Sequence, residues 1–309
     1  MNGDGNLDLV VGMKPAAGAP RVYLNDGARW QPAPQWQLPV DFVTINTLSK
    51  KEDLGVQLTD VNGDGLADLV RSQDVIRTSD PETVEATIRE VWLNDGTAWA
   101  PPPQDCDTAQ PSGYCFPSLM RTAFFREFAF IYSYNRREFY SGGTQLVDVN
   151  GDGLPDLLTA RKNGRRAVYL NDGKKGWQPA PARALPFDFV RSDDLSTSFT
   201  PVDLGVRLAD VNGDGLADVL KAYSDFRVTE DQRPLVCLNN GAGWNTPGAW
   251  IFPGADTPDP ADDVLFGGVT NTTGLLHRDY GVQLVDLDGD RHPDVLVRRN
   301  APARRAAST

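Results

Sequence analysis

The chain consists of short apolar segments separated by polar turns, and no stretch has the apolar spacing of a helix. Apolar residues recur directly after copies of an acidic loop, at 69–70, 157–158, 219–220 and 295–297. Other β-rich runs lead into the loops, as at 54–58 and 204–208. Short runs of this kind, bounded by Gly, Asn and Asp, are typical of strands. The pattern therefore predicts an all-β protein.

The acidic loop has nine positions and occurs five times. Loops 2 to 5 are complete, whereas loop 1 lacks its first aspartate; in order, the five span residues 2–8, 60–68, 148–156, 210–218 and 286–294. Oxygen-bearing side chains stand at positions 1, 3, 5 and 9 of the complete loops. Glycine, which tolerates left-handed turns, stands at positions 4 and 6, except that loop 5 has Arg291 at position 6.

This arrangement of oxygens is typical of a site for a hard cation. Calcium takes 6–8 oxygen ligands at roughly 2.3–2.6 Å, and alternate residues of a tight loop all point inward. We therefore predict Ca²⁺ as the cofactor, bound by side chains at positions 1, 3, 5 and 9 and by the backbone carbonyl at position 7. The predicted ligands are Asn2, Asp4, Asp8, Asp60, Asn62, Asp64, Leu66, Asp68, Asp148, Asn150, Asp152, Leu154, Asp156, Asp210, Asn212, Asp214, Leu216, Asp218, Asp286, Asp288, Asp290, His292 and Asp294.

Two other kinds of loop share part of this pattern. An EF-hand begins in the same way but requires a bidentate Glu at position 12, between two helices. The residues at that position cannot chelate through a carboxylate: Val11, Arg71, Thr159, Lys221 and Val297. A metal-free turn rich in Asn and Asp remains an alternative, because these residues favour turns on their own.

A second element recurs between the loops. It is a β-rich run ending in Asn-Asp-Gly or Asn-Asn-Gly, a strong hairpin signal, at 22–27, 91–96, 168–173 and 236–241. A tryptophan follows each run: Trp30, Trp99, Trp177 and Trp244. Each unit thus has about four short strands, which predicts a β-propeller built of four-stranded blades. The tryptophans are expected to pack between blades, or alternatively to line sugar-binding grooves.

The loop Asp-Val-Asn-Gly-Asp-Gly-Leu-x-Asp within four-stranded units resembles the FG-GAP/VCBS-type repeat of integrin-α-like β-propellers and of many bacterial secreted and surface proteins. It is also similar to repeats that flank Rhs and toxin-complex proteins. The resemblance covers residues 1–300 and implies seven-bladed propellers with calcium in inter-strand loops, which bind ligands and do not catalyse. This chain has too few units for that ring. Residues 301–309 are expected to form a disordered basic tail.

Charge and composition exclude some classes of function. The 309 residues carry a net charge of −12, and four bound calcium ions would bring it to about −4. The acidity is therefore mostly that of ligands, and nucleic-acid binding, which needs a basic surface, is not expected. No apolar run reaches the length of a membrane span. There is no signal peptide, and since Met1 falls inside a repeat, we expect the natural chain to extend further.

The cysteines leave one question open. Cys106 and Cys115 lie in a Pro/Gly/Ser-rich segment, where they either pair or remain free thiols. Cys237 takes a position that is aromatic in the other units and is expected to be a buried core thiol.

The second unit carries an insertion at 100–142. Aromatic residues at 128, 130, 132 and 134 would share one face of a strand and pack into a blade, or form an exposed ledge for a partner.

Catalysis is not predicted. His277 and His292 are the two histidines, and the adjacent pairs at 193–194 and 262–263 are expected to be solvated loop charges. We predict a non-catalytic, calcium-stabilised extracellular or cell-surface binding or adhesion module with a protein or glycan ligand. The alternatives are a lectin or carbohydrate-active enzyme on a propeller, or a toxin-associated scaffold.

Overall fold

The predicted strands are present in the computed structural model, in which the described residues contain no helix. None of them therefore forms a helix suited to crossing a membrane. The described residues are 1–13, 21–45, 51–76, 86–103, 106, 112–116, 125–128, 138–141, 143–161, 166–195, 198–225, 234–245, 265–270, 276–279, 281–290 and 292–297.

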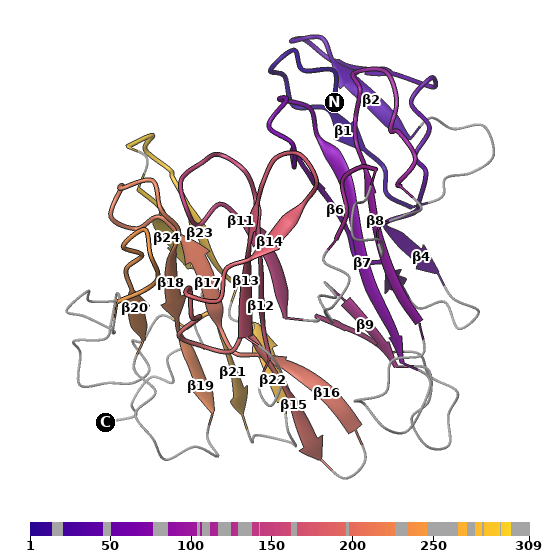
Figure 1. The fold of residues 1–309 in the computed structure, drawn as a ribbon. Coiled ribbons are helices and arrows are strands. Elements are labelled where there is room, and N and C mark those ends of the chain that lie inside the picture. Colours follow the sequence, from indigo (N-terminus) through magenta and orange to yellow (C-terminus); the bar gives the residue numbers. More distant parts are fainter. Residues whose placement is uncertain are drawn as a thin grey trace, which may run out of the picture.

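The third unit displays the repeat most completely. Its strands β11 (Thr144–Val147), β12 (Asp156–Ala160), β13 (Arg166–Asn171) and β14 (Trp177–Pro179) form one antiparallel sheet in sequence order (Figure 1). Loop 3 joins β11 to β12, and the Asn-Asp-Gly turn joins β13 to β14 with Asn171 opposite Trp177. The sequence predicted this unit correctly.

The other units keep the same order with fewer strands. The first has β1 (Leu9–Val10), β2 (Val22–Asn25) and β3 (Trp30–Pro32); the second has β6 (Val56–Thr59), β7 (Asp68–Ile76) and β8 (Ala86–Trp92). The fourth has β17 (Val206–Ala209), β18 (Asp218–Lys221) and β20 (Leu235–Cys237), and the fifth has β23 (Val282–Val285) and β24 (Asp294–Val297). In the second and fourth units the predicted last strand is reduced to single bridges, Asn94 with Trp99 and Asn239 with Trp244.

The connectors between units form further strands at the end of the units away from the calcium-type loops (Figure 1). Two are hairpins, β4 (Val43–Ile45) with β5 (Lys51–Asp53) and β15 (Val190–Leu195) with β16 (Ser198–Asp203). The strand β9 (Phe125–Phe128) joins β10 (Glu138–Ser141) and runs parallel to β7. The strand β21 (Gly267–Thr270) joins β22 (Leu276–Asp279) and runs parallel to β19 (Tyr223–Asp225).

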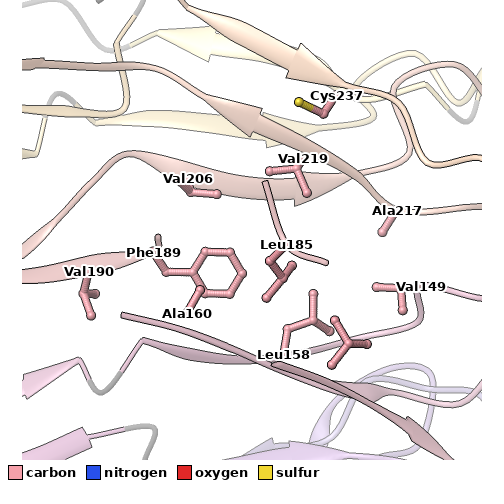
Figure 2. Packing of buried hydrophobic residues seen from close by; sticks show 11 residues of the cluster. Val149, Leu158, Ala160, Leu185, Phe189, Val190, Val206, Ala217, Val219 and Cys237 are labelled. Atoms are coloured by element: carbon pink, nitrogen blue, oxygen red, sulfur yellow. The ribbon is translucent and has the colours of Figure 1, made fainter. Parts of the chain in front are cut away.

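The core lies between successive sheets. Neighbouring residues of a strand point to opposite faces, so Leu157 packs with Val61 and Val70 of the second unit. Leu158 packs on the other side with Val206 and Val219 of the fourth unit (Figure 2). Because both faces of the strand after loops 2, 3 and 4 are covered, the apolar run of each of these strands is continuous rather than alternating. The units therefore stack like propeller blades, in an open row rather than a closed ring (Figure 1).

The structure shows the state of the three cysteines. Cys106 and Cys115 form a disulfide, and Cys237 is a buried free thiol, as expected. The disulfide anchors a segment whose Tyr114 and Phe116 rings pack on Trp177, with ring centroids 5.4 and 4.9 Å away.

Two predictions fall largely outside the described part of the chain. The basic tail at 301–309 lies outside it, and so do residues 130, 132 and 134 of the aromatic run. Of that run, residues 125–128 are described and form strand β9.

Candidate functional site

The first aspartate of each complete loop organises the turn that follows it. Asp60 Oδ1 accepts the backbone N–H of Gly63 at 2.8 Å, and Asp60 Oδ2 accepts that of Gly65 at 2.7 Å. These glycines have φ of +77° and +83°, a left-handed conformation that side chains rarely adopt. Equivalent bonds reach the glycine at position 4 from Asp148, Asp210 and Asp286.

Positions 3 and 5 form two successive side-chain turns. Asn62 Oδ1 accepts the N–H of Asp64 at 3.1 Å, and Asp64 Oδ1 accepts the N–H of Leu66 at 2.8 Å. The Asn62 amide also donates to Asp64 Oδ2 at 2.9 Å. The pattern repeats at Asn150 and Asp152 of loop 3 and at Asn212 and Asp214 of loop 4. The side-chain oxygens of positions 1, 3 and 5 are thus gathered on one tight, exposed loop.

The aspartate at position 9 lies deeper and joins the loop to the sheet. Asp68 is buried, with Oδ2 accepting the N–H of Val61 at 2.9 Å and Oδ1 accepting that of Asn94 at 2.7 Å. Asp156 and Asp218 are buried with equivalent bonds. Burial raises the pKa of Asp68 and of Asp156 to about 6 and also raises the pKa of Asp218, although these N–H bonds oppose the shift.

Among the described residues, loop 5 is the place where three carboxylates lie closest together. Carboxylate oxygens of Asp286, Asp288 and Asp294 lie within 4.8 Å of one another. Position 3 is Asp in this loop and Asn in loops 2 to 4, so the amide that donates to position 5 elsewhere is replaced by a charged oxygen. Asp290 Oδ1 accepts the N–H of His292 at 2.8 Å, which preserves the turn.

Loop 1 differs, because the chain's amino group takes part in it. Asp8, at position 9, accepts the Met1 ammonium at 2.7 Å and the N–H of Asn25 at 2.8 Å. Asn2 and Asp4 keep the side-chain turn of positions 3 and 5.

Position 7 carries a contact that the sequence did not predict. The Leu154 side chain lies over the position-4 glycine of the preceding loop, and a Cβ added to Gly63 would be 3.0 Å from Leu154 Cδ2. Leu66, Leu216 and His292 take the same place over Gly3, Gly151 and Gly213. The loops therefore form a row in which each contacts the next.

An asparagine whose contacts the sequence did not predict links the same row. The Asn171 amide donates to the carbonyl of Val61 in loop 2, at 2.8 Å, and to that of Pro155 in loop 3, at 3.2 Å. Asn239 joins loops 3 and 4 through Val149 and Ala217 in the same way. Asn94 joins loop 2 to the carbonyl of Met1, directly before loop 1. The signal in the sequence is the Asn that opens each hairpin turn, for which the pattern predicts only a turn.

The repeated tryptophan has a second structural role. Its indole N–H donates to the position-8 carbonyl of its own unit, at 3.1 Å from Trp30 to Leu7 and 2.8 Å from Trp177 to Pro155. Trp99 and Trp244 do the same to Ala67 and Ala217. Trp99 and Trp177 are buried, whereas Trp30 is exposed. The buried tryptophans, Trp99 and Trp177, therefore pack between units.

The match to a known family agrees with the repeated loops. The family model of the FG-GAP-like repeat matches residues 1–71 and 148–221, which include loops 1 to 4. An Agrocybe aegerita lectin that recognises non-reducing terminal N-acetylglucosamine matches 89% of this chain, with 16% identity and a TM-score of 0.48. The Photorhabdus luminescens Tc holotoxin pore matches 95% of the chain, with 19% identity and a TM-score of 0.45.

This chain spans 54% of the lectin chain and 10% of the toxin chain. No curated protein matches its sequence. The repeated loops and their position between the first two strands of each unit agree with the family match: the chain contains FG-GAP-like repeats, at residues 1–71 and 148–221.

Proposed function

We propose that the protein is a non-catalytic binding module whose fold is stabilised by Ca²⁺ in the loops. The observation that carries this proposal is the repetition of one loop geometry, in which the same oxygens are gathered by the same backbone bonds in loops 2, 3 and 4. Carboxylate and amide oxygens at alternate positions fit a hard cation of variable coordination better than a soft one.

The electrostatics of the row support a structural role for the ion. Each complete loop gathers at least three aspartates, and consecutive loops are in contact, so like charges accumulate along the row. Bound divalent ions would offset this repulsion and hold the turns in place. If each site had micromolar affinity, millimolar calcium would stabilise the fold by about 4 kcal/mol per site.

An extracellular or cell-surface setting is part of the proposal. The Cys106–Cys115 disulfide supports it, because disulfides persist in oxidising compartments. Millimolar calcium is available there as well. The ligand we propose is a protein or a glycan.

A lectin function would need exposed aromatic rings repeated from blade to blade. The tryptophan series does not supply them, because Trp99 and Trp177 are buried between units. The toxin-associated scaffold remains the other alternative and would also be a binding role.

The test is thermal unfolding with 2 mM calcium and with EDTA, together with calorimetric titration, in the parent protein and two variants. Asp152→Asn removes a charged ligand of loop 3 while keeping a side-chain acceptor for the Leu154 N–H. Asp172→Asn is the matched control, because Asn240 fills the same turn position in the fourth unit.

We expect calcium to raise the melting temperature of the parent and of Asp172→Asn by similar amounts. Asp152→Asn should show a smaller rise and bind one ion fewer, with little change in EDTA. Equal melting temperatures with and without calcium, and no binding heat, would refute the calcium role.

A further inference from the structure

The contact between the second and third units is covered by part of the insertion. At the contact between the first and second units, Trp36 covers Trp99, with ring centroids 5.1 Å apart, and Trp36 belongs to the Pro-rich stretch of the first unit. Trp177 of the third unit is covered instead by residues 112–116, which lie within the insertion and are called the bridging segment below. The second unit therefore uses its insertion to complete this contact.

The bridging segment reaches the polar link between loops 2 and 3. Tyr114 is buried, and its hydroxyl donates to the Val61 carbonyl at 2.7 Å. The same carbonyl accepts the Asn171 amide, and the Tyr114 hydroxyl also contacts Asn171 Oδ1. The segment thus supplies both apolar cover and hydrogen bonding to the contact.

The backbone of the bridging segment lies directly on the third unit. The Cys115 N–H donates to the Lys175 carbonyl at 3.0 Å, and Cys115 forms a parallel bridge with Gly176. Gly176 has a φ of +119°, and a Cβ added there would overlap the Cys115 carbonyl oxygen. The close approach of the two backbones therefore requires glycine at this position.

A disulfide restrains the bridging segment. Cys115 lies inside the segment and is bonded to Cys106, nine residues earlier, so the bond closes a short ring. Such a ring limits the conformations that the segment can adopt when it is released. The chain has one further cysteine, Cys237, so a second disulfide within the chain cannot form at the other contacts between units.

The two sulfurs of the disulfide differ in access. Cys106 is half-buried, whereas Cys115 is buried beside the third unit. The sulfur that a thiolate attacks depends on which one it can reach. A thiolate from solution therefore reaches Cys106 Sγ more easily than Cys115 Sγ.

We propose that the Cys106–Cys115 disulfide is a redox-controlled latch on the contact between the second and third units, opened by dithiol reductants. One thiolate of the dithiol attacks Cys106 Sγ, the S–S bond breaks, and Cys115 leaves as a thiolate that takes up a proton. The second thiolate of the dithiol then displaces Cys106, which is protonated in turn, and closes a cyclic disulfide. Two electrons thus pass from the dithiol to the protein.

Reduction opens this contact locally. Without the ring, the bridging segment gains conformational freedom on release, so the equilibrium between its bound and released states shifts toward release. Trp177 and the link at Val61 then lose the cover of Tyr114. The latch depends on the disulfide and on packing, and it is independent of the proposed calcium role.

The test is hydrogen exchange of the full chain, at one fixed calcium concentration, before and after reduction with dithiothreitol. The double variant Cys106→Ser/Cys115→Ser represents the open latch and has no bond to reduce. Gly243 of the fourth unit is the internal control, because it occupies the same turn position as Gly176 and its amide also donates to the first side chain of the turn. Circular dichroism checks that each sample is folded, and mass spectrometry checks that reduction is complete.

We expect reduction to make exchange at Cys115 and Gly176 at least about tenfold faster, with little change at Gly243. The double variant should exchange rapidly at Gly176 without reductant and should not respond to dithiothreitol. Reoxidation of the parent in air should restore slow exchange. Unchanged exchange at Gly176 after complete reduction would overturn the proposal.

Two further results would also overturn it. One is equal acceleration at Gly176 and Gly243, and the other is unfolding of the reduced parent or of the double variant. In either case the disulfide would stabilise the whole fold and would not control a single contact.

Discussion

At the scale of single residues, the repeat is held by groups that serve two purposes at once. The indole of Trp177 fills the space between the second and third units and also donates its N–H to the Pro155 carbonyl. The carboxylate of Asp156 belongs to the loop and also receives N–H groups of the loop and of the next strand. The loop chemistry and the packing of the core therefore depend on the same side chains.

Replacing Trp177 should cost far more stability than replacing Trp30. We expect Trp177→Ala to lower the free energy of unfolding by about 3–5 kcal/mol, as for large-to-small changes in a core. Trp30→Ala should cost about 1 kcal/mol or less, because the ring is exposed and mainly its hydrogen bond is lost. Urea unfolding of the two variants measures the difference. Equal losses would contradict the inference that burial decides the role of each tryptophan.

Cys237 should be protected from alkylation in the native protein. Burial raises the pKa of its thiol to about 11, so at pH 8 the group is almost wholly protonated, and the thiolate is the reactive form. Mass spectrometry after iodoacetamide treatment should find Cys237 unlabelled in native protein and labelled in guanidinium chloride. Rapid labelling of native protein would contradict the buried position.

At the scale of the elements, consecutive loops are mechanically joined. The Asn171 amide contacts loops 2 and 3, and the Leu154 side chain lies over Gly63. A structural change in one loop should therefore alter the neighbouring loop. Turns that did not contact one another would change independently. The sequence predicted each loop correctly. It did not predict that neighbouring loops contact one another.

Asn171→Ala should loosen both adjoining loops. We expect a loss of about 1–3 kcal/mol, since the change removes buried hydrogen bonds to two carbonyls. Hydrogen exchange should become faster at Gly63 in loop 2 and at Gly153 in loop 3 together. Asn25→Ala is the control, because the Asn25 amide contacts the carbonyl of Leu7 in its own loop. Faster exchange confined to loop 3 would contradict the coupling.

At the scale of the whole molecule, the acidic loops lie in one row along one end of the stacked units. The negative charge behind the net value of −12 is therefore concentrated along this row. Repulsion between aspartates is strongest there. The opposite end of the units carries hairpins from the connectors, such as β15–β16 (Figure 1). We therefore expect the stability of the protein to depend on the ionic conditions.

In EDTA, added sodium chloride should stabilise the protein, because salt screens repulsion between exposed charges. We expect the melting temperature in EDTA to rise between 10 and 150 mM salt (Debye lengths of about 30 and 8 Å). In 2 mM calcium the same change should have a smaller effect, since the ions that we propose to bind there would already offset the repulsion. Differential scanning calorimetry measures both series, and identical salt responses would argue against repulsion in the calcium-free loops.

The sequence by itself determined the all-β class, the order of elements in each unit and the position of every loop. The reason is that Asn, Asp and Gly encode these turns locally, through bonds that span two to seven residues, as between Asp60 and Gly63. The continuous apolar run after loops 2, 3 and 4 likewise reflects a strand buried on both faces.

The tertiary structure decided which members of each series are buried and what they contact. Asn171 reaches Val61, which is 110 residues away in the chain, and Trp177 is covered by Tyr114 from an insertion. The same residue types at the ends of the row, Trp30 and Leu296, remain exposed because no neighbouring unit among the described residues covers them. Burial depends on what lies across the interface, and local sequence does not contain that information.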